Sequence, residues 1–158
     1  MQKNNLNYLT NGRKLGTNNR KYYLFNCLTL MNILELKILP NQYSIHGLLP
    51  KHELPDLLYR KNSFFSFTYT DEETSLICES SFDIKDSLRD DSWSCIKLVG
   101  QLNVEETGIW SRITTACSNC GCAVLTVTTF NTDYFLVKTM QLEKLKSFFL
   151  ENNFVFVD

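Results

Sequence analysis

The residue best placed for chemistry is a carboxylate, Asp133, at a polar interruption between two apolar stretches. Residues 123–127 and 134–137 are apolar or β-branched, so the triplet 131–133 between them predicts the turn of a β-hairpin. Asp133 is therefore expected at the end of a sheet, where a ligand can reach it. The alternative is a turn residue whose carboxylate caps its own backbone.

A second candidate for chemistry is a Cys-x-x-Cys-x-Cys cluster formed by Cys117, Cys120 and Cys122. Such a cluster can bind zinc or an iron–sulfur centre, but tetrahedral zinc needs a fourth ligand. No second cysteine pair or nearby histidine accompanies it, since His46 and His52 lie in the first half of the chain. Cysteine also packs as a small apolar residue. We therefore expect no metal or cofactor, and a metal or redox site here is the weakest of three hypotheses.

Motifs for catalysis are missing from the sequence. There is no phosphate-cradling glycine loop, no nucleophile elbow and no Ser/His/Asp arrangement. Lys37, Arg60 and Lys97 are read as solvated charges on strand faces or edges, where they also discourage edge pairing. The sequence thus predicts a protein that is not an enzyme.

Length and composition limit the class of protein. The chain has 158 residues, of which 44% are hydrophobic and 13% aromatic, enough for one domain or two very small ones that share a core. The formal net charge of −1 provides no general field that would attract nucleic acid. No apolar run approaches the roughly 18 residues of a spanning helix. We expect a soluble, cytoplasmic protein that binds neither nucleic acid nor membrane.

The first thirty residues differ in kind from the rest. Residues 2–21 are rich in Asn, Lys, Arg, Gly and Thr and have little apolar periodicity, so residues 1–30 are expected to be a disordered tail or a non-native extension. A targeting presequence is the alternative, because the segment is basic and lacks acids until Glu35. Met31 is a candidate start, since ordered-looking sequence begins directly after it.

Hydrophobic periodicity predicts two similar halves, at residues 31–92 and 93–158. In the first half we expect strands at 33–39, 43–49, 64–69 and 75–78, a short helix at 53–59, a strand break at Pro40-Asn41 and a polar connection at 81–92. In the second we expect strands at 93–102, 123–129, 134–138 and 154–157. We also expect two helices: one at 105–117, stopped by Cys120-Gly121, in which Ile109, Ile113, Ala116 and Cys117 recur at helical spacing, and one with the buried stripe Leu142, Leu145, Phe148 and Phe149. At the start of the first of these helices, Asn103 is a candidate cap, and Glu105 and Glu106 place negative charge at the positive end of the helix dipole.

The second half therefore reads as β-α-β-β-α-β, the ferredoxin-like unit, and the first half as a shortened version of it. This order resembles ACT domains, and more narrowly the small bacterial two-ACT proteins and the CASTOR-type arginine sensors. The segments that carry the resemblance are 34–40, 64–68, 75–76, 106–109 and 129–133. It implies an α+β fold of two ferredoxin-like ACT modules, the N-terminal one shortened, and covers the chain from residue 33 onward.

In that family a free amino acid is held at an interface between modules and is not turned over. The resemblance implies the following ligand-facing residues: Glu106, Gly108, Ile109, Trp110, Thr129, Phe130 and Asp133, with Ala123 and Val124 as an edge that contributes backbone contacts to a facing module. The chemistry suits an amino acid, whose carboxylate fits N–H groups at a helix start and whose cationic group fits a carboxylate. Arginine or another cationic amino acid is the first candidate.

Two departures from the pattern bear on the ligand. Trp110 stands where the sensors have a smaller apolar residue, so the indole can fill or shrink the pocket, and Asn103 replaces a glycine. We therefore keep two main hypotheses. The first is a regulatory, amino-acid-binding homodimer that signals to a regulatory protein partner. The second is a structural interaction module whose pocket is closed by Trp110 and whose sheet edges bind another protein.

Overall fold

The computed structural model describes residues 33–49, 63–100 and 107–158. In these residues a sheet runs in the order β2-β3-β1-β4-β6-β5, and β7 pairs with β1 outside this path. The strands are β1 (Leu34–Leu48), β2 (Ser66–Tyr69), β3 (Thr74–Glu79), β4 (Ser87–Leu98), β5 (Leu125–Thr128), β6 (Asp133–Lys138) and β7 (Phe154–Phe156). The helices are α3 (Ile109–Asn119), α4 (Leu142–Leu150) and the 3-10 turn η1 (Thr139–Gln141). The tail predicted at residues 1–30 lies outside the described residues.

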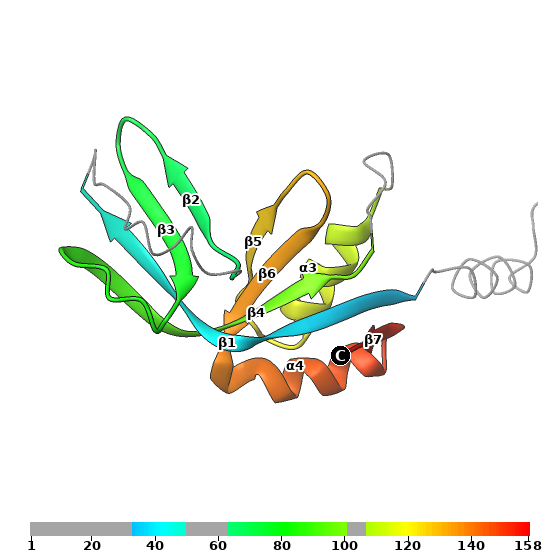
Figure 1. Cartoon of the computed structure of the whole chain (residues 1–158). Coiled ribbons are helices and arrows are strands. Elements are labelled where there is room, and N and C mark those ends of the chain that lie inside the picture. Colours follow the sequence, from blue (N-terminus) through cyan, green and yellow to red (C-terminus); the bar gives the residue numbers. More distant parts are fainter. Residues whose placement is uncertain (1–32, 50–62, 101–106) are drawn as a thin grey trace, which may run out of the picture. The chain divides into compact units, whose positions relative to one another are not determined.

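Two long antiparallel strands, β1 and β4, run side by side and link two half-sheets (Figure 1). Residues 43–48 of β1 pair with β3, which pairs with β2, while residues 87–90 of β4 pair with β1. We call this the N-terminal half-sheet. Residues 34–36 of β1 pair with β7, and residues 93–97 of β4 pair with β6, which pairs with β5. We call this the C-terminal half-sheet.

Two sequence predictions for these long strands are wrong. The break expected at Pro40-Asn41 is an irregularity of register inside one continuous strand, between the pairs of Ile38 and Gln42. The polar connection expected at 81–92 is strand from Ser87 onward. Residues 88–92 of β4 are exposed, so the polar side chains of residues 89–92 are compatible with a strand although they read as a loop.

The N-terminal half-sheet has the strand order of a ferredoxin-like unit without its second helix. Taking β1, β2, β3 and β4 as the four strands, their order β2-β3-β1-β4 is the one a β-α-β-β-α-β chain produces. The segment 80–86 between β3 and β4 contains turns and bends in place of a helix. The short helix predicted at 53–59 lies outside the described residues.

The C-terminal half-sheet follows the predicted order β4-α3-β5-β6-α4-β7 and confirms the α+β, ferredoxin-like fold class. One feature was not predicted. The first residues of β1 lie between β4 and β7, where β7 would otherwise pair directly with β4. The strand nearest the start of the described chain thus completes the sheet of the second half.

Helix α3 begins at Ile109 and not at the predicted Glu105. The residue before it, Gly108, has a φ of 88°, a left-handed conformation that a helix interior does not contain and that glycine adopts without strain. Asn103, Glu105 and Glu106, the expected cap and first-turn acids, lie outside the described residues. The predicted stop is confirmed, because Cys120 ends the helix and Gly121 follows with a φ of 69°.

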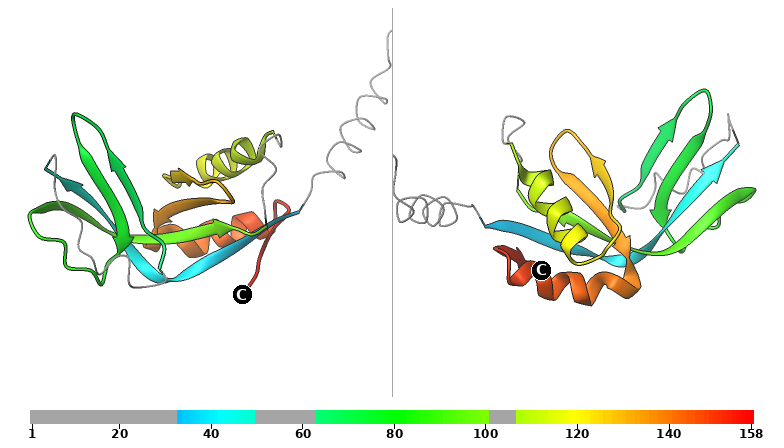
Figure 2. Two further views of the ribbon diagram at one scale, coloured as in Figure 1. Left: turned by 45° about the horizontal axis from the view of Figure 1, so that its top comes forward. Right: turned by 180° about the vertical axis from the view of Figure 1, so that it is seen from behind.

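Both helices cover the same face of the C-terminal half-sheet (Figure 2). They bury the predicted stripe of Ile109, Ile113, Ala116 and Cys117 on α3. Of the stripe predicted on α4, Leu145 and Phe149 are buried and Leu142 and Phe148 are half-buried. These side chains meet residues of the sheet in one apolar core, which we call the helix-side core; its sheet residues are Leu34, Leu36, Ile96, Leu98, Phe135, Val137 and Phe154. Among the described residues, no helix is long and apolar enough to cross a membrane.

Candidate functional site

The hairpin of β5 and β6 is closed by a threonine turn. The backbone N–H of Thr129 donates to the carbonyl of Thr132 at 3.1 Å, and the Thr129 hydroxyl donates to the same carbonyl. Thr128 lies opposite Asp133 in the ladder. The hydroxyl of Thr129, which the resemblance assigns to a ligand, is therefore used to shape the turn that presents Asp133.

Thr132 fixes the hairpin to the neighbouring strand. It is buried, and its hydroxyl donates to the carbonyl of Leu98 at the end of β4, at 2.5 Å. Because β4 leads toward α3, this bond holds Asp133 close to the end of the sheet from which α3 starts. Sequence reasoning did not single out Thr132, and its place in a polar turn was the only signal for it.

The first turn of α3 reaches Asp133 through one hydrogen bond. The indole Nε1 of Trp110 donates to Oδ2 of Asp133 at 2.8 Å. The indole also lies edge-on to the fully buried ring of Phe135, with ring centroids 6.2 Å apart. Both Trp110 and Asp133 are half-buried. Phe135 supports the contact from the sheet, a role that its place in an apolar strand did not reveal.

The remaining predicted residues at the helix start serve the backbone and the core. Ile109 is buried in the helix-side core, which anchors the first turn of α3. Gly108 is exposed, and its carbonyl accepts the N–H of Arg112 at 3.0 Å. The N–H groups of a helix's first turn are suited to a carboxylate. Glu106 lies outside the described residues.

Three predicted residues do not join the group around Asp133. Ala123 and Val124 precede β5 at the opposite end of the strand from the turn, and β5 forms the outer end of the described sheet path. Phe130, at the tip of the hairpin, is 94% exposed. The structure thus brings together Gly108, Ile109, Trp110, Thr129 and Asp133. Ala123 and Phe130 are exposed, and Val124 packs against the helix-side core.

The cysteine cluster belongs to the helix-side core. Cys117, Cys120 and Cys122 are all buried and free, and burial raises the pKa of the Cys117 thiol to about 12. A thiol that stays protonated at neutral pH is a poor nucleophile. The Cys120 carbonyl accepts a hydrogen bond from the ammonium group of Lys144 at 2.6 Å, which connects the end of α3 to α4. In the described part of the chain, no three His, Cys, Asp or Glu residues are placed to hold a metal ion.

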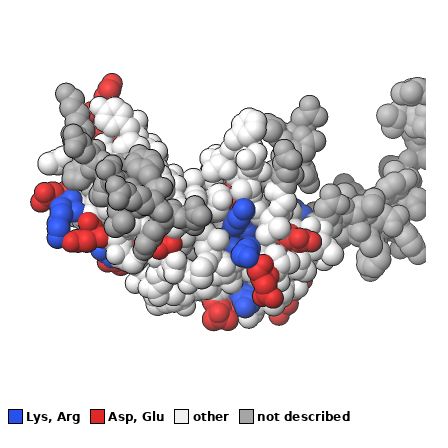
Figure 3. Space-filling view, viewed as in Figure 1, with Lys and Arg blue, Asp and Glu red and all other residues white. Residues whose placement is uncertain are grey.

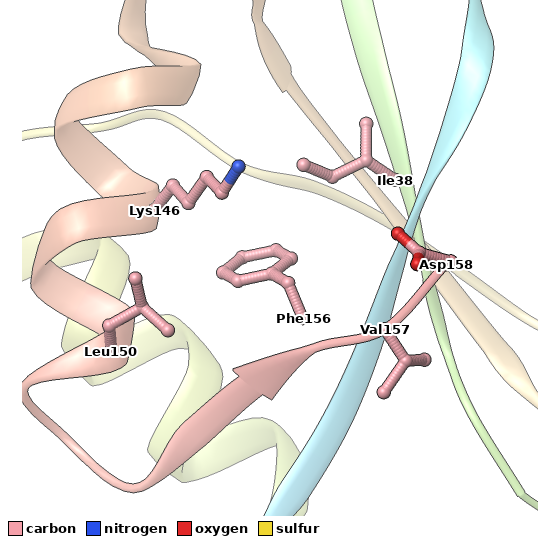
Figure 4. A pocket seen from close by; sticks show the side chains of 6 residues that line it. All are labelled: Ile38, Lys146, Leu150, Phe156, Val157 and Asp158. Atoms are coloured by element: carbon pink, nitrogen blue, oxygen red, sulfur yellow. The ribbon is translucent and has the colours of Figure 1, made fainter.

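Two pockets lie away from the predicted residues. One, of about 350 Å³, lies between α4 and β7, where Lys146 extends over the ring of Phe156 toward Ile38, and Asp158 borders the other side (Figure 4). The other, of about 770 Å³, lies at the end of the N-terminal half-sheet beside Leu48, Thr74 and Arg89. Neither includes Trp110 or its neighbours.

Charged side chains are mixed on the face seen in Figure 3, where neither sign gathers into a continuous patch of described residues. Three ion pairs join described residues, and all are at least partly exposed: Lys85–Asp83, Arg89–Asp91 and Lys138–Asp90. Exposed pairs of this kind contribute little to stability.

Comparison with protein-family models shows that residues 88–145 match an ACT domain. This stretch runs from β4 into α4 and contains Trp110, the β5–β6 turn and Asp133. No curated protein sequence matches the chain significantly.

Among solved structures, the chain is similar to protein Atu0741 from Agobacterium tumefaciens, with 30% sequence identity and a TM-score of 0.73 over 80% of this chain and 94% of that one. The protein VC0802 from Vibrio cholerae, of unknown function, gives 12% identity and a TM-score of 0.59 over 82% and 98%. The regulatory subunit of aspartate kinase from Thermus flavus gives 7% identity and a TM-score of 0.55 over 77% and 99%. The last two comparisons concern the fold alone.

Proposed function

This chain belongs to the ACT-domain family, and on that premise we propose that it is a non-catalytic regulatory protein that binds a free amino acid at an interface between two ACT modules. Arginine or another cationic amino acid is the first candidate ligand. Domains of similar fold form regulatory subunits of aspartate kinase, which is consistent with a regulatory role. The choice of arginine rests on the sequence resemblance to arginine sensors, in particular on its segments 106–109 and 129–133.

The observation that carries the proposal is the meeting of α3 and β6 at Trp110 and Asp133. An amino acid with a cationic side chain needs a carboxylate for that side chain and N–H donors for its own carboxylate. Asp133 supplies the first, and the helix start after Gly108 supplies groups of the second kind. Thr132 and Phe135 hold both parts in place from the sheet.

We further propose that a second copy of the chain completes the site. β5 pairs with β6 along one side, and its other side is the end of the described sheet path. Ala123 and Val124 lead into this strand, which supports the proposal that their backbone groups contact a neighbouring module across the edge. A homodimer joined at this edge encloses a ligand that a single copy leaves partly open to solvent.

The test is thermal unfolding of the full chain against each of the twenty amino acids at millimolar concentration. A ligand that binds only the folded state stabilises it by mass action, by about 2.7 kcal/mol at a concentration 100 times its Kd. We expect a dose-dependent rise in Tm for arginine or lysine. Asp133→Asn removes the charge and should abolish the rise.

The matched control is Asp71→Asn. Asp71 lies in the turn of the other hairpin, β2–β3, and is exposed, so this substitution also removes one turn carboxylate. It should leave the ligand response unchanged. A panel without any rise in Tm contradicts the proposed function, and an equal loss in both variants contradicts the role of Asp133.

The second candidate function is a structural interaction module without a small ligand. Two observations favour it: the indole of Trp110 already uses Asp133, and Phe130 is exposed at the hairpin tip, where an aromatic side chain can anchor a protein contact. A flat amino-acid panel, together with a change of oligomeric state in Phe130→Ser measured by light scattering, identifies this function.

A further inference from the structure

We propose that Trp110 is an internal competitor for the ligand site, whose indole occupies the Asp133 carboxylate until a cationic ligand displaces it. The inference rests on the proposed function, because it concerns how the same site is regulated. On this proposal, a ligand binds only if its interaction with Asp133 is stronger than that of the Trp110 indole.

The geometry supports competition. The Trp110 Nε1 atom lies 2.8 Å from Oδ2 of Asp133, a normal hydrogen-bond distance, so the indole occupies the acceptor position of that oxygen on the side of α3, where a ligand held at the helix start would donate. The edge-on contact with Phe135 holds the ring in this place. Asp133 and Phe135 are on the same face of β6, since side chains alternate along a strand. The indole therefore covers the carboxylate from the side of α3.

The charge of the ligand's donor group determines whether it can displace the indole from Asp133. An indole N–H is a neutral donor, while a guanidinium or ammonium group makes a charge-assisted bond to a carboxylate that is roughly twice as strong as a neutral one. A neutral ligand group gains little by replacing the indole. The contact therefore keeps the site closed to neutral molecules and allows a cationic side chain to open it.

A comparison with the other tryptophan sharpens the assignment. Trp93 belongs to the apolar cluster of Tyr43, Ile77, Cys95 and Leu136, away from the helix-side core, and its Nε1 is buried without a hydrogen-bond partner in the described part of the structure. Its N–H thus cannot regulate Asp133. The same Trp→Phe change at the two positions separates loss of the indole donor at the site from loss of an indole in general.

The experiment measures arginine affinity by titration calorimetry for the full chain, Trp110→Phe and Trp93→Phe. Phenylalanine keeps an aromatic ring against Phe135 but has no donor for Asp133. We expect Trp110→Phe to bind arginine about tenfold more tightly, the factor that corresponds to about 1.4 kcal/mol. Trp93→Phe should bind as the unmodified chain does. Circular dichroism verifies that both variants fold.

A second readout follows the indole directly. In the Trp93→Phe background, Trp110 is the only tryptophan of the chain, because the sequence has two. Its fluorescence emission should shift to longer wavelength as arginine saturates the site, since the displaced indole enters water.

The outcomes separate the two proposals. If the unmodified chain binds arginine and Trp110→Phe binds equally or more weakly, the indole supports the site and the competitor is refuted while the proposed function stands. Arginine binding without any change in Trp110 emission refutes it in the same way. If neither protein responds to any of the twenty amino acids, the proposed function fails and the inference fails with it.

Discussion

The two half-sheets have related strand orders, but different kinds of structure cover them. On the C-terminal half-sheet, two helices bury an apolar core. On the N-terminal half-sheet, the segment 80–86 replaces the second helix, and hydrogen bonds tie this segment and the start of β4 to β1. The Ser44 hydroxyl donates to Asp91 at 2.5 Å and accepts a hydrogen bond from the Ser80 hydroxyl at 2.7 Å, and Arg89 donates to the Ser80 carbonyl at 2.8 Å. The same segment buries Phe82 and Ile84 in a small apolar cluster with Leu48, Leu76 and Cys78. The comparison shows that a short segment can take the place of a helix through a small apolar cluster and a polar network together.

The hairpins β2–β3 and β5–β6 have similar turns but differ in the contacts that fix those turns. In each, a threonine hydroxyl closes the turn, Thr70 onto Glu73 and Thr129 onto Thr132. Only for the second hairpin do the described contacts extend from the turn to β4 and to a helix, through Thr132 and Trp110. A turn becomes a candidate site when neighbouring elements fix its carboxylate in place.

The largest effect should come from opening the helix-side core. Phe149 is fully buried, stacks on Phe154 at 4.4 Å and lies near Phe135 and Phe156. We expect Phe149→Ala to lower the free energy of unfolding by about 3–5 kcal/mol, measured by urea denaturation. Phe130→Ala, at an exposed position, should change it by less than about 0.5 kcal/mol. Equal losses would contradict the assignment of stability to this core.

The next effect compares two leucines of the same strand. Leu36 contributes to the helix-side core and Leu48 to the smaller cluster of the N-terminal half-sheet. Leu36→Ala should cost about 2–5 kcal/mol of unfolding free energy. Leu48→Ala should cost less, because fewer apolar neighbours surround it. A larger loss at Leu48 would show that the N-terminal half-sheet is the more tightly packed part.

A smaller effect tests the polar network. Ser44→Ala removes a buried hydroxyl with two partners, one of them a carboxylate, and should cost about 2 kcal/mol. The control is Ser94→Ala in the C-terminal half-sheet, which loses one neutral bond to Thr139 and should cost about 1 kcal/mol. Denaturant titrations of both variants decide. If Ser44→Ala is neutral, the network is not what holds segment 80–86.

The smallest effect is a dependence of the free energy of unfolding on pH, which we assign to His46 in the N-terminal half-sheet. Burial and the nearby Arg89 guanidinium lower the pKa of His46 below 6.5, and the Asp91 carboxylate raises it by less. Just below pH 6.5, His46 therefore binds more protons in the unfolded chain than in the folded one. The contribution of neutral His46 to stability is complete above that pH and falls as the pH decreases. The slope is at most about 1.4 kcal/mol per pH unit for one proton.

His46→Asn is the variant for this measurement, because its amide N–H can replace the ring Nδ1 that lies 2.8 Å from the Ser87 hydroxyl. Between pH 7.5 and 5.5 its unfolding free energy should decrease less than that of the unmodified chain. His52→Gln serves as the control for the other histidine and should keep the full decrease. An unchanged slope in His46→Asn would contradict the assignment.

Local pattern was sufficient for much of the fold. The hairpins and the stripes on α3 and α4 follow from periodicity and turn residues, which depend on neighbours in sequence. The start of β4 was not predicted, because its residues 89–92 are exposed and polar. The placement of β1 between β4 and β7 was not predicted either, because it depends on partners distant in sequence.

The residues of the candidate site likewise divide into those that the sequence predicted and those that depend on contacts between distant elements. Turn chemistry alone pointed to Asp133, and the resemblance added the helix start. The contact between Trp110 and Asp133 depends on how α3 packs on the sheet, which no local pattern encodes. Thr132 and Phe135 look like ordinary turn and strand residues until the neighbouring elements are in place. The boundary between the modules at residues 92 and 93 stays a prediction, since β1 and β4 run through both half-sheets.

The pairing of Leu34 with Phe154 has a consequence for how the chain acquires its structure. The two residues are about 120 positions apart, so their ladder closes a very long loop, and long-range pairing slows folding. During synthesis, the first residues of β1 emerge long before β7 exists. Until then an apolar strand edge is open to other chains, which makes this stage the point of greatest risk for aggregation.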